Sequence, residues 1–236
     1  MEETREFHWF ETDRLEKVQK ERVALGMPSH ASPFSILVAA MGNHWKEGCF
    51  DAVYAMAKYS VEEGYKICLY EEPDRCIQPF DAIGTMRNHA YMKAIAEGYE
   101  YLCYIDNDVC PPKEALVDLA RRYLPIVAPI IEYPDNQQFD TVGITRLERN
   151  KGLAVTRSVV LSFLLCRTMV FIPWATIPFW ENAIGAGEAY HWQRLYMAGH
   201  QPFIDTDVLV PVVDIPHFPF DHKLDNGIQH WAMCIV

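Results

Sequence analysis

A series of short apolar runs, separated by segments with helical spacing, sets the strongest limit on how this chain can fold. The first run, FSILVAAM at residues 34–41, is apolar almost throughout, which is typical of a strand buried on both faces in a parallel sheet. The other runs lie at residues 65–70, 101–105 and 126–131. The first half of the chain is therefore expected to form a parallel sheet.

Each segment between these runs carries its own helix boundary signal. Gly64 and Gly98 follow the first two segments, where a residue with positive φ commonly ends a helix. Pro111 and Pro112 precede the third, where proline fits the first turn. The helices are expected at residues 50–63, 83–96 and 113–123. Strand–helix alternation of this kind predicts a doubly wound, mostly parallel α/β sheet with right-handed crossovers.

The pattern changes after Glu132, where residues 133–150 are polar and rich in turn formers. We interpret 153–166 as two strands that could pair antiparallel, and 203–213 as a further strand region. A helix over 188–198, closed by Gly199, and a charged N-terminal helix over 11–26 complete the expected elements.

No linker separates the two halves, so the sequence indicates a single domain over residues 1–236. Its expected parts are an N-terminal helix and loop (1–33), a nucleotide-binding half (34–132), and an acceptor half with mixed strands and a tail (133–236).

Composition narrows the class of protein. Half of the 236 residues are hydrophobic and 13% are aromatic, which excludes a disordered or collagen-like chain. No apolar run approaches the roughly 18 residues of a membrane-spanning helix. Residues 1–12 are charged and lack the apolar stretch of a secretory signal, so a cytoplasmic location is expected. The seven cysteines form no C-x-x-C pair, which argues against a zinc ribbon and fits a reducing compartment.

Charge bears on the partners that the chain can bind. Lys and Arg total 21 against 32 Asp and Glu, which gives a net charge of −11. This balance disfavours a nucleic acid as partner or acceptor, although a local basic groove would still permit one.

The sharpest chemical feature is Asp106-Asn107-Asp108, directly after the apolar run that ends at Ile105. Two aspartates at i and i+2 point the same way if the chain stays extended. Ligands of open parallel sheets bind at the strand ends, and two convergent carboxylates favour a hard divalent ion such as Mg²⁺ or Mn²⁺. The alternative is a surface turn with two solvated aspartates.

Three other positions are candidates for the same site. Arg87, next to Asn88, follows Gly84 and Thr85 at the expected start of the second helix and could bind a diphosphate through its guanidinium fork, or lie in solvent. Glu188 begins a later helix and could be a general base or only a helix cap. His217, between Pro216 and Pro219, could be a third metal ligand or a structural histidine.

The order of these features resembles the GT-A fold nucleotide-sugar glycosyltransferases, especially the compact family 2-like bacterial and phage enzymes. The resemblance covers residues 34–218 and is strongest in the stretch GTMRNHAYMKAIAEGYEYLCYIDNDVCPPKEAL. It implies a Rossmann-like, mostly parallel sheet flanked by helices, with mixed strands in the C-terminal half. It also implies a metal-dependent glycosyl transfer from a nucleoside-diphosphate sugar, most simply a UDP-sugar, with inversion.

The same resemblance assigns roles to residues. It implies that Mn²⁺ or Mg²⁺ binds Asp106, Asp108 and His217, and that Glu188 deprotonates the acceptor hydroxyl. Ala189 departs from the pattern, because many relatives keep a second acid at this position. Donor contacts are implied at Met41, Gly42, Arg87, Asn88, Asp106 and Asn107.

Other classes share parts of this pattern. A HAD-type phosphatase also has Asp-x-Asp-x-Val after a strand, but near its start and with a later acidic pair, whose context Asp205 and Asp207 lack. A nucleotidyltransferase would need a Gly-rich basic loop after the first strand, and AAMGNHW is not one. A catalytically silent GT-A protein, serving in binding or assembly, is favoured by Ala189.

Overall fold

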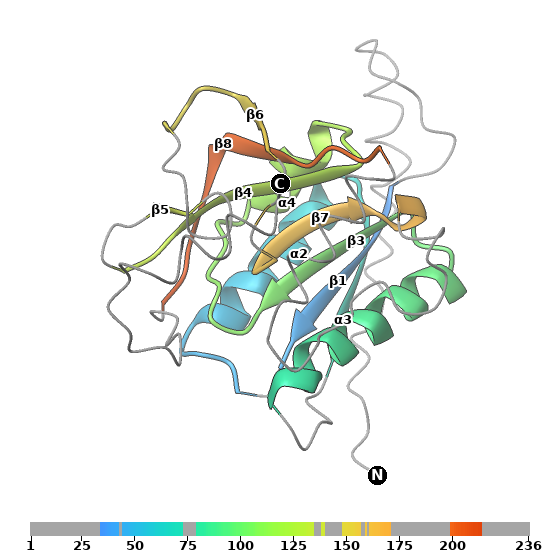
Figure 1. The fold of residues 1–236 in the computed structure, drawn as a ribbon. Helices are drawn as coiled ribbons and strands as arrows, with labels where there is room; N and C mark the ends of the chain where they lie inside the picture. Colours follow the sequence, from blue (N-terminus) through green and yellow to red (C-terminus); the bar gives the residue numbers. More distant parts are fainter. Residues whose placement is uncertain are drawn as a thin grey trace.

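The computed structural model describes residues 34–42, 44–72, 79–134, 138–139, 148–156, 159, 161–170 and 199–213. In these residues, eight strands form one sheet with the order β2-β1-β3-β7-β4-β8-β6, and β5 pairs with β4 (Figure 1). The strands are β1 (Ser35–Met41), β2 (Lys66–Glu72), β3 (Tyr101–Asp106), β4 (Ile126–Glu132), β5 (Gln138–Phe139), β6 (Leu153–Val155), β7 (Phe163–Arg167) and β8 (Phe203–Pro211). The helices are α2 (Cys49–Glu62), α3 (Pro79–Ala96) and α4 (Ala115–Arg121).

Strand direction brings several strand ends to one edge of the sheet. β1 is parallel to β2 and β3, and β4 is parallel to β8. β7 lies antiparallel between β3 and β4, so these two strands also run the same way. The expected mostly parallel α/β sheet is therefore confirmed. We call the edge where these strands end the carboxyl edge; its strand-end residues are Met41, Glu72, Asp106, Glu132 and Pro211.

The strands of the second half pair differently from one possibility raised by the sequence. β6 and β7 do not pair with each other: β6 is antiparallel to β8, whereas β7 fills the space between β3 and β4. The antiparallel β7 thus joins the two groups of parallel strands into one sheet.

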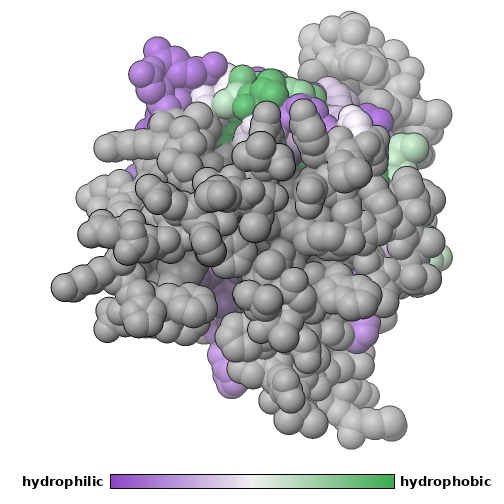
Figure 2. Space-filling model, viewed as in Figure 1, coloured by the Kyte–Doolittle hydropathy of each residue, from purple (hydrophilic) through white to green (hydrophobic). Residues whose placement is uncertain are grey.

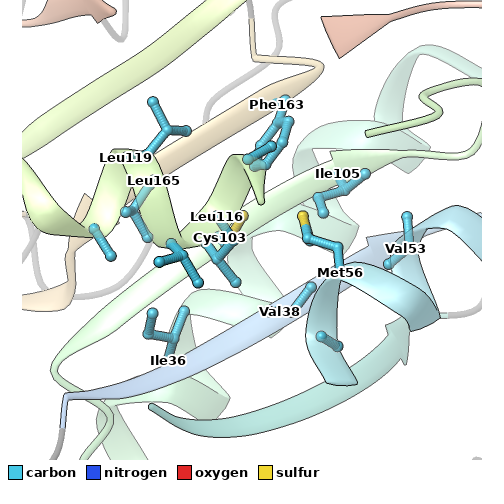
Figure 3. Close-up of a cluster of buried hydrophobic side chains, with 14 of the residues drawn as sticks. Ile36, Val38, Val53, Met56, Cys103, Ile105, Leu116, Leu119, Phe163 and Leu165 are labelled. Carbon is cyan, nitrogen blue, oxygen red and sulfur yellow. The ribbon is translucent and has the colours of Figure 1, made fainter. Parts of the chain in front are cut away.

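Both faces of the sheet are buried, as the apolar runs predict. Ile36 and Val38 face one core together with residues of α2 and α4, whose packing is drawn in Figure 3. Leu37 and Ala39 face a second core that includes residues of α3. Because successive side chains of a strand point to opposite faces, one apolar run supplies both cores.

α2 and α4 match the expected helices at 50–63 and 113–123, whereas the expected helices at 11–26 and 188–198 lie outside the described residues. The remaining described helix differs at its start. α3 begins at Pro79, before the predicted start at Ile83, so Gly84 and Thr85 lie inside the helix. Proline is favourable at the first position of a helix, which fits a start at Pro79 rather than at Ile83. Arg87 is consequently about two turns inside α3 rather than at its N-terminus.

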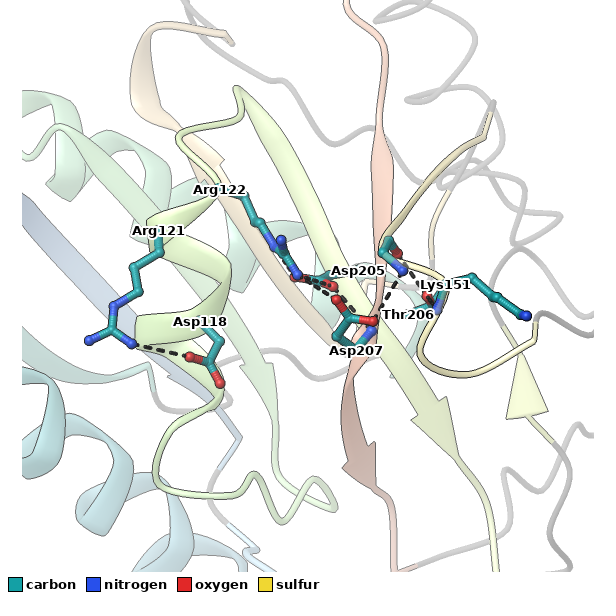
Figure 4. Close-up of polar contacts among 8 residues, drawn as sticks. Asp118, Arg121, Arg122, Lys151, Asp205, Thr206 and Asp207 are labelled. Atoms are coloured by element: carbon teal, nitrogen blue, oxygen red, sulfur yellow. Dashed lines mark hydrogen bonds and ion pairs between the residues drawn. The ribbon is translucent and has the colours of Figure 1, made fainter. Parts of the chain in front are cut away.

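A polar cluster fixes an irregularity of β8 away from the carboxyl edge (Figure 4). Pro129 of β4 pairs with Asp205, but the next residue, Ile130, pairs with Leu209, so β8 bulges at this point. Proline lacks the N–H that a regular ladder needs, which explains the place of the bulge. Arg122 clamps the bulge: its guanidinium donates to the fully buried Asp205 at 2.6 and 3.0 Å and to Asp207 at 2.8 Å.

Among the described strands, the sheet ends at β6, which has only three residues. Figure 2 shows apolar side chains gathered at the upper edge of the view, where Figure 1 places β6 and β8. Leu153 and Val155 of β6 are 40% and 68% exposed.

Within the described residues, no helix combines the length and apolar character that crossing a bilayer requires.

The Arg122 cluster gives a direct test of the fold. Arg122→Ala should lower the free energy of unfolding by about 2–4 kcal/mol, because it leaves the buried Asp205 carboxylate without its cation. Arg121→Ala is the matched control, since the neighbouring arginine is 43% exposed and forms surface ion pairs, which contribute about 0–1 kcal/mol. Urea denaturation of both variants measures the difference, and equal effects would contradict a structural role for the cluster.

Candidate functional site

The Asp106-Asn107-Asp108 motif lies at the carboxyl edge, where the sequence predicts it. Asp106 is the last residue of β3 and pairs with Met41, the last residue of β1. Its backbone N–H donates to the carbonyl of Ser162 at 2.9 Å, and Val109 N–H donates back to the Asp106 carbonyl at 3.2 Å. The chain therefore turns at Asn107 and Asp108 instead of staying extended, so the condition under which the two aspartates would point the same way is not met. The Asp106 side chain is 27% exposed.

Arg87 approaches Asp106 from α3. Its Nη2 lies 3.5 Å from Asp106 Oδ1, and its side chain is only 3% exposed. The hydroxyl of Tyr104, on β3, donates to the Arg87 carbonyl at 3.0 Å. Burial raises the pKa of the Tyr104 phenol well above its usual value, so this hydroxyl keeps the proton that it donates. The helix is therefore tied to the strand at the residue whose cation points to Asp106.

Asp108 and the residues after it are joined to the end of β8. Val109 and Val212 form an antiparallel bridge, and Val213 N–H donates to the Asp108 carbonyl at 2.9 Å. Cys110 N–H donates to Pro211 O at 2.9 Å. The chain therefore leaves β8 beside the Asp-x-Asp turn, only a few residues before His217.

Asn107 uses both its side chain and its backbone on the loop after β1. Its Nδ2 donates to the carbonyl of His44 at 2.9 Å, and its own carbonyl accepts from Lys46 N–H at 3.0 Å. Gly42 has a φ of +97°, and a Cβ added there would lie 3.1 Å from Asn107 Nδ2. The loop and the acid turn thus meet at a position where only glycine fits without strain.

A thiol lies close to the motif but is not suited to nucleophilic chemistry. Burial raises the pKa of Cys49 to about 12, with further contributions from the Cys110 thiol and the Asp108 carboxylate. A cysteine acts as a nucleophile through its thiolate, so Cys49 remains a neutral thiol at physiological pH.

The structure thus brings most of the predicted site residues to one edge of the sheet. Asn88 follows Arg87 on α3 and is half-buried. Glu188 and His217 lie outside the described residues, so their roles stay predictions. Sequence reasoning missed Tyr104; a hydroxyl inside an apolar run was the available signal, since a buried phenol usually finds a hydrogen-bond partner. The predicted residues at the carboxyl edge are Met41, Gly42, Arg87, Asp106, Asn107 and Asp108.

The donor set suits a hard divalent cation. Asp106 and Asp108 offer carboxylate oxygens, and Mg²⁺ is commonly held by one or two carboxylates together with substrate phosphates and water. Within the described residues, no group of three or more His, Cys, Asp and Glu side chains is arranged to hold a metal ion. A cation here would therefore depend on the ligand's phosphates or on a further residue.

Comparison with known proteins identifies the fold. No family model and no curated protein match the sequence. The catalytic domain of Drosophila β1,4-galactosyltransferase 7, in complex with xylobiose, matches with a TM-score of 0.51 and 13% identity over 84% of this chain and 79% of that one. GalNAc-T7 with UDP, GalNAc and Mn²⁺ matches with a TM-score of 0.50 and 10% identity over 88% of this chain. This chain covers 53% of GalNAc-T7. The chain has the fold of these glycosyltransferases, as the GT-A resemblance implied.

The close approach at Gly42 predicts a difference between two glycines. Gly42→Ala and Gly48→Ala both place a Cβ on a residue with positive φ, at +97° and +79°, which costs about 1–2 kcal/mol. Only the Gly42 Cβ meets a neighbour, Asn107 Nδ2, because nothing lies within 4 Å of the Gly48 Cβ. Thermal melts should show the larger loss of stability for Gly42→Ala, and the reverse order would contradict the packing of Gly42 against Asn107.

Proposed function

We propose that this chain is a metal-dependent glycosyltransferase that moves a sugar from a nucleotide-sugar donor, most simply a UDP-sugar, to an acceptor hydroxyl. The observation that carries the proposal is the Asp106-Asn107-Asp108 turn at the carboxyl edge, beside the buried Arg87, in a sheet with a glycosyltransferase fold. The presence of UDP and Mn²⁺ in the GalNAc-T7 structure supports this class of donor and cofactor.

Different residues of the described site would bind the metal, the phosphates and the nucleoside of the donor. Asp106 and Asp108 would hold Mn²⁺ or Mg²⁺, which supplies a Lewis acid for the charge that develops on the departing nucleoside diphosphate. Arg87, whose guanidinium faces Asp106, orients this carboxylate and adds positive charge beside the phosphates. Met41 ends β1 next to the acid turn, and it and Gly42 would contact the nucleoside. Asn88, which follows Arg87 on α3, would be a further donor contact.

The third metal ligand and the general base would come from His217, which follows β8, and Glu188, which precedes it. Val213 N–H donates to the Asp108 carbonyl, so the last described residue before His217 is held at the acid turn. His217 follows it by four residues, which supports His217 as a third metal ligand. Glu188 would take the proton of the acceptor hydroxyl as general base. The sugar would pass through an oxocarbenium-like state and invert its configuration.

Two other functions can be weighed against this one. A HAD-type phosphatase would need a later acid pair near Asp106, but Asp205 is fully buried and ion-paired with Arg122 near the start of β8, away from the carboxyl edge. Ala189 favours a catalytically silent binding protein, which would bind the donor without turnover. Assays with donor and Mn²⁺ separate this alternative from the transferase.

Metal dependence is the first test of the proposal. UDP with Mn²⁺ should stabilise the parent protein by about 2.7 kcal/mol when the ligand is at a hundred times its Kd, and EDTA should remove the shift. Asp106→Ala and Asp108→Ala should lose this shift in melting temperature while they still fold.

Asp207→Asn is the matched control, because it alters the other Asp-x-Asp sequence of the chain, in the Arg122 cluster. It should retain the shift produced by UDP and Mn²⁺. A parent shift that EDTA leaves unchanged would contradict the metal role, and a stable phosphoaspartate on Asp106 would favour the phosphatase.

The charge of Arg87 gives a second test. Arg87→Ala should weaken UDP binding by about 1–3 kcal/mol, the scale of a hydrogen bond to a charged group. Arg87→Lys should restore only part of the affinity, because a lysine lacks the planar fork. Calorimetric titration with UDP measures both variants, and an unchanged Kd in Arg87→Ala would remove Arg87 from the donor site.

The general base gives a third test. Glu188→Gln should keep the donor affinity and lower kcat by about 10²–10⁴-fold, because the amide cannot accept the acceptor proton. A near-parental kcat would exclude Glu188 as the base. Loss of folded protein would instead indicate a helix cap, so a melting curve accompanies the kinetics.

A further inference from the structure

Asn107 lies between the two proposed metal ligands, yet its polar groups point to another part of the chain. The amide nitrogen donates to His44 O at 2.9 Å, and the backbone carbonyl accepts from Lys46 N–H at 3.0 Å. An asparagine supplies this donor, whereas an aspartate could not donate to a carbonyl. The side chain is therefore engaged with the loop that follows β1.

Residues 44–48 of this loop lead directly into α2. Cys49 N–H, at the start of the helix, donates to Lys46 O at 3.1 Å. The ring of Trp45 packs edge-on against Phe50 with the centroids 5.3 Å apart. At the other end of the loop, the missing side chain of Gly42 makes room for the Asn107 amide. A shift of the acid turn would therefore be passed to the loop through Asn107.

We infer that Asn107 is a positioning residue that couples the metal half of the donor site to its nucleoside half. The inference rests on the proposed function, in which Asp106 and Asp108 bind the metal and the end of β1 with its loop receives the nucleoside. A cation that orders the acid turn then also orders the loop, so metal and nucleoside bind cooperatively. Coupling of this kind is reciprocal and typically changes affinity about 5–150-fold.

A nucleoside without phosphates separates this coupling from direct contacts. Uridine offers no phosphate for Mn²⁺ to bridge, so an effect of Mn²⁺ on uridine binding that disappears when the Asn107 amide is removed passes through the protein. We would titrate uridine and UDP into the full chain, with saturating Mn²⁺ and with EDTA. In the parent protein, Mn²⁺ should lower the Kd of uridine by about fivefold or more.

Two variants should remove the coupling by different routes. Asn107→Ala deletes the amide, and Asn107→Leu keeps a side chain of similar size without its N–H donor. In both, the Kd of uridine should become nearly the same with Mn²⁺ and with EDTA, while UDP binding stays Mn²⁺-dependent because both aspartates remain. Gly48→Ala is the control: it strains the same loop through a positive φ, with no atom within 4 Å of its Cβ, and should keep the parental ratio.

The outcomes distinguish the two proposals. If UDP binding to the parent does not depend on Mn²⁺, the proposed function fails and the coupling fails with it. If UDP depends on Mn²⁺ but uridine does not, or if the uridine ratio survives in Asn107→Ala, the coupling alone is overturned. Should Asn107→Ala not fold, a parental ratio in Asn107→Leu overturns it equally.

Discussion

Burial of the sheet on both faces is the constraint on which the rest of the structure depends. β1 and β3 give one set of side chains to the core under α2 and α4 and the other set to the core under α3. An ionised side chain inside either core would be costly without a partner. In β3 the charged chemistry therefore lies at the strand end, where Asp106 is the first residue of the strand to reach partial exposure.

The two Asp-x-Asp sequences of this chain show how environment, rather than spacing, decides a role. Asp205 is fully buried and receives two hydrogen bonds from the guanidinium of Arg122, so its oxygens are committed to the bulge of β8. Asp106 is partly exposed and its cation, Arg87, stands 3.5 Å away. The Asp205 pair is therefore part of the structural framework, whereas Asp106 keeps a partly exposed carboxylate that a ligand can reach.

The parts of the fold that the sequence predicted are those with a local signal. The strands and most helix ends follow from apolar runs, glycines and prolines, and the acid motif follows directly after such a run. The contacts that sequence reasoning missed join distant positions: Arg122 and Asp205 are 83 residues apart, and Asn107 and His44 are 63 apart. The position of β7 between β3 and β4 is likewise determined by tertiary packing, because the sequence of a short apolar strand does not specify which strands it pairs with.

Charge balance at the carboxyl edge gives a physical reason why a divalent cation belongs to the proposed reaction. Asp106 and Asp108 bring two negative charges to one turn, and Arg87 is the cation paired with Asp106. A nucleoside diphosphate would add further negative charge at the same place, and close like charges repel strongly in a partly desolvated site. Arg87 cannot neutralise both the carboxylates and the phosphates. A small cation that shares its coordination between carboxylate and phosphate oxygens makes the same two aspartates a binding site instead of a repulsive one.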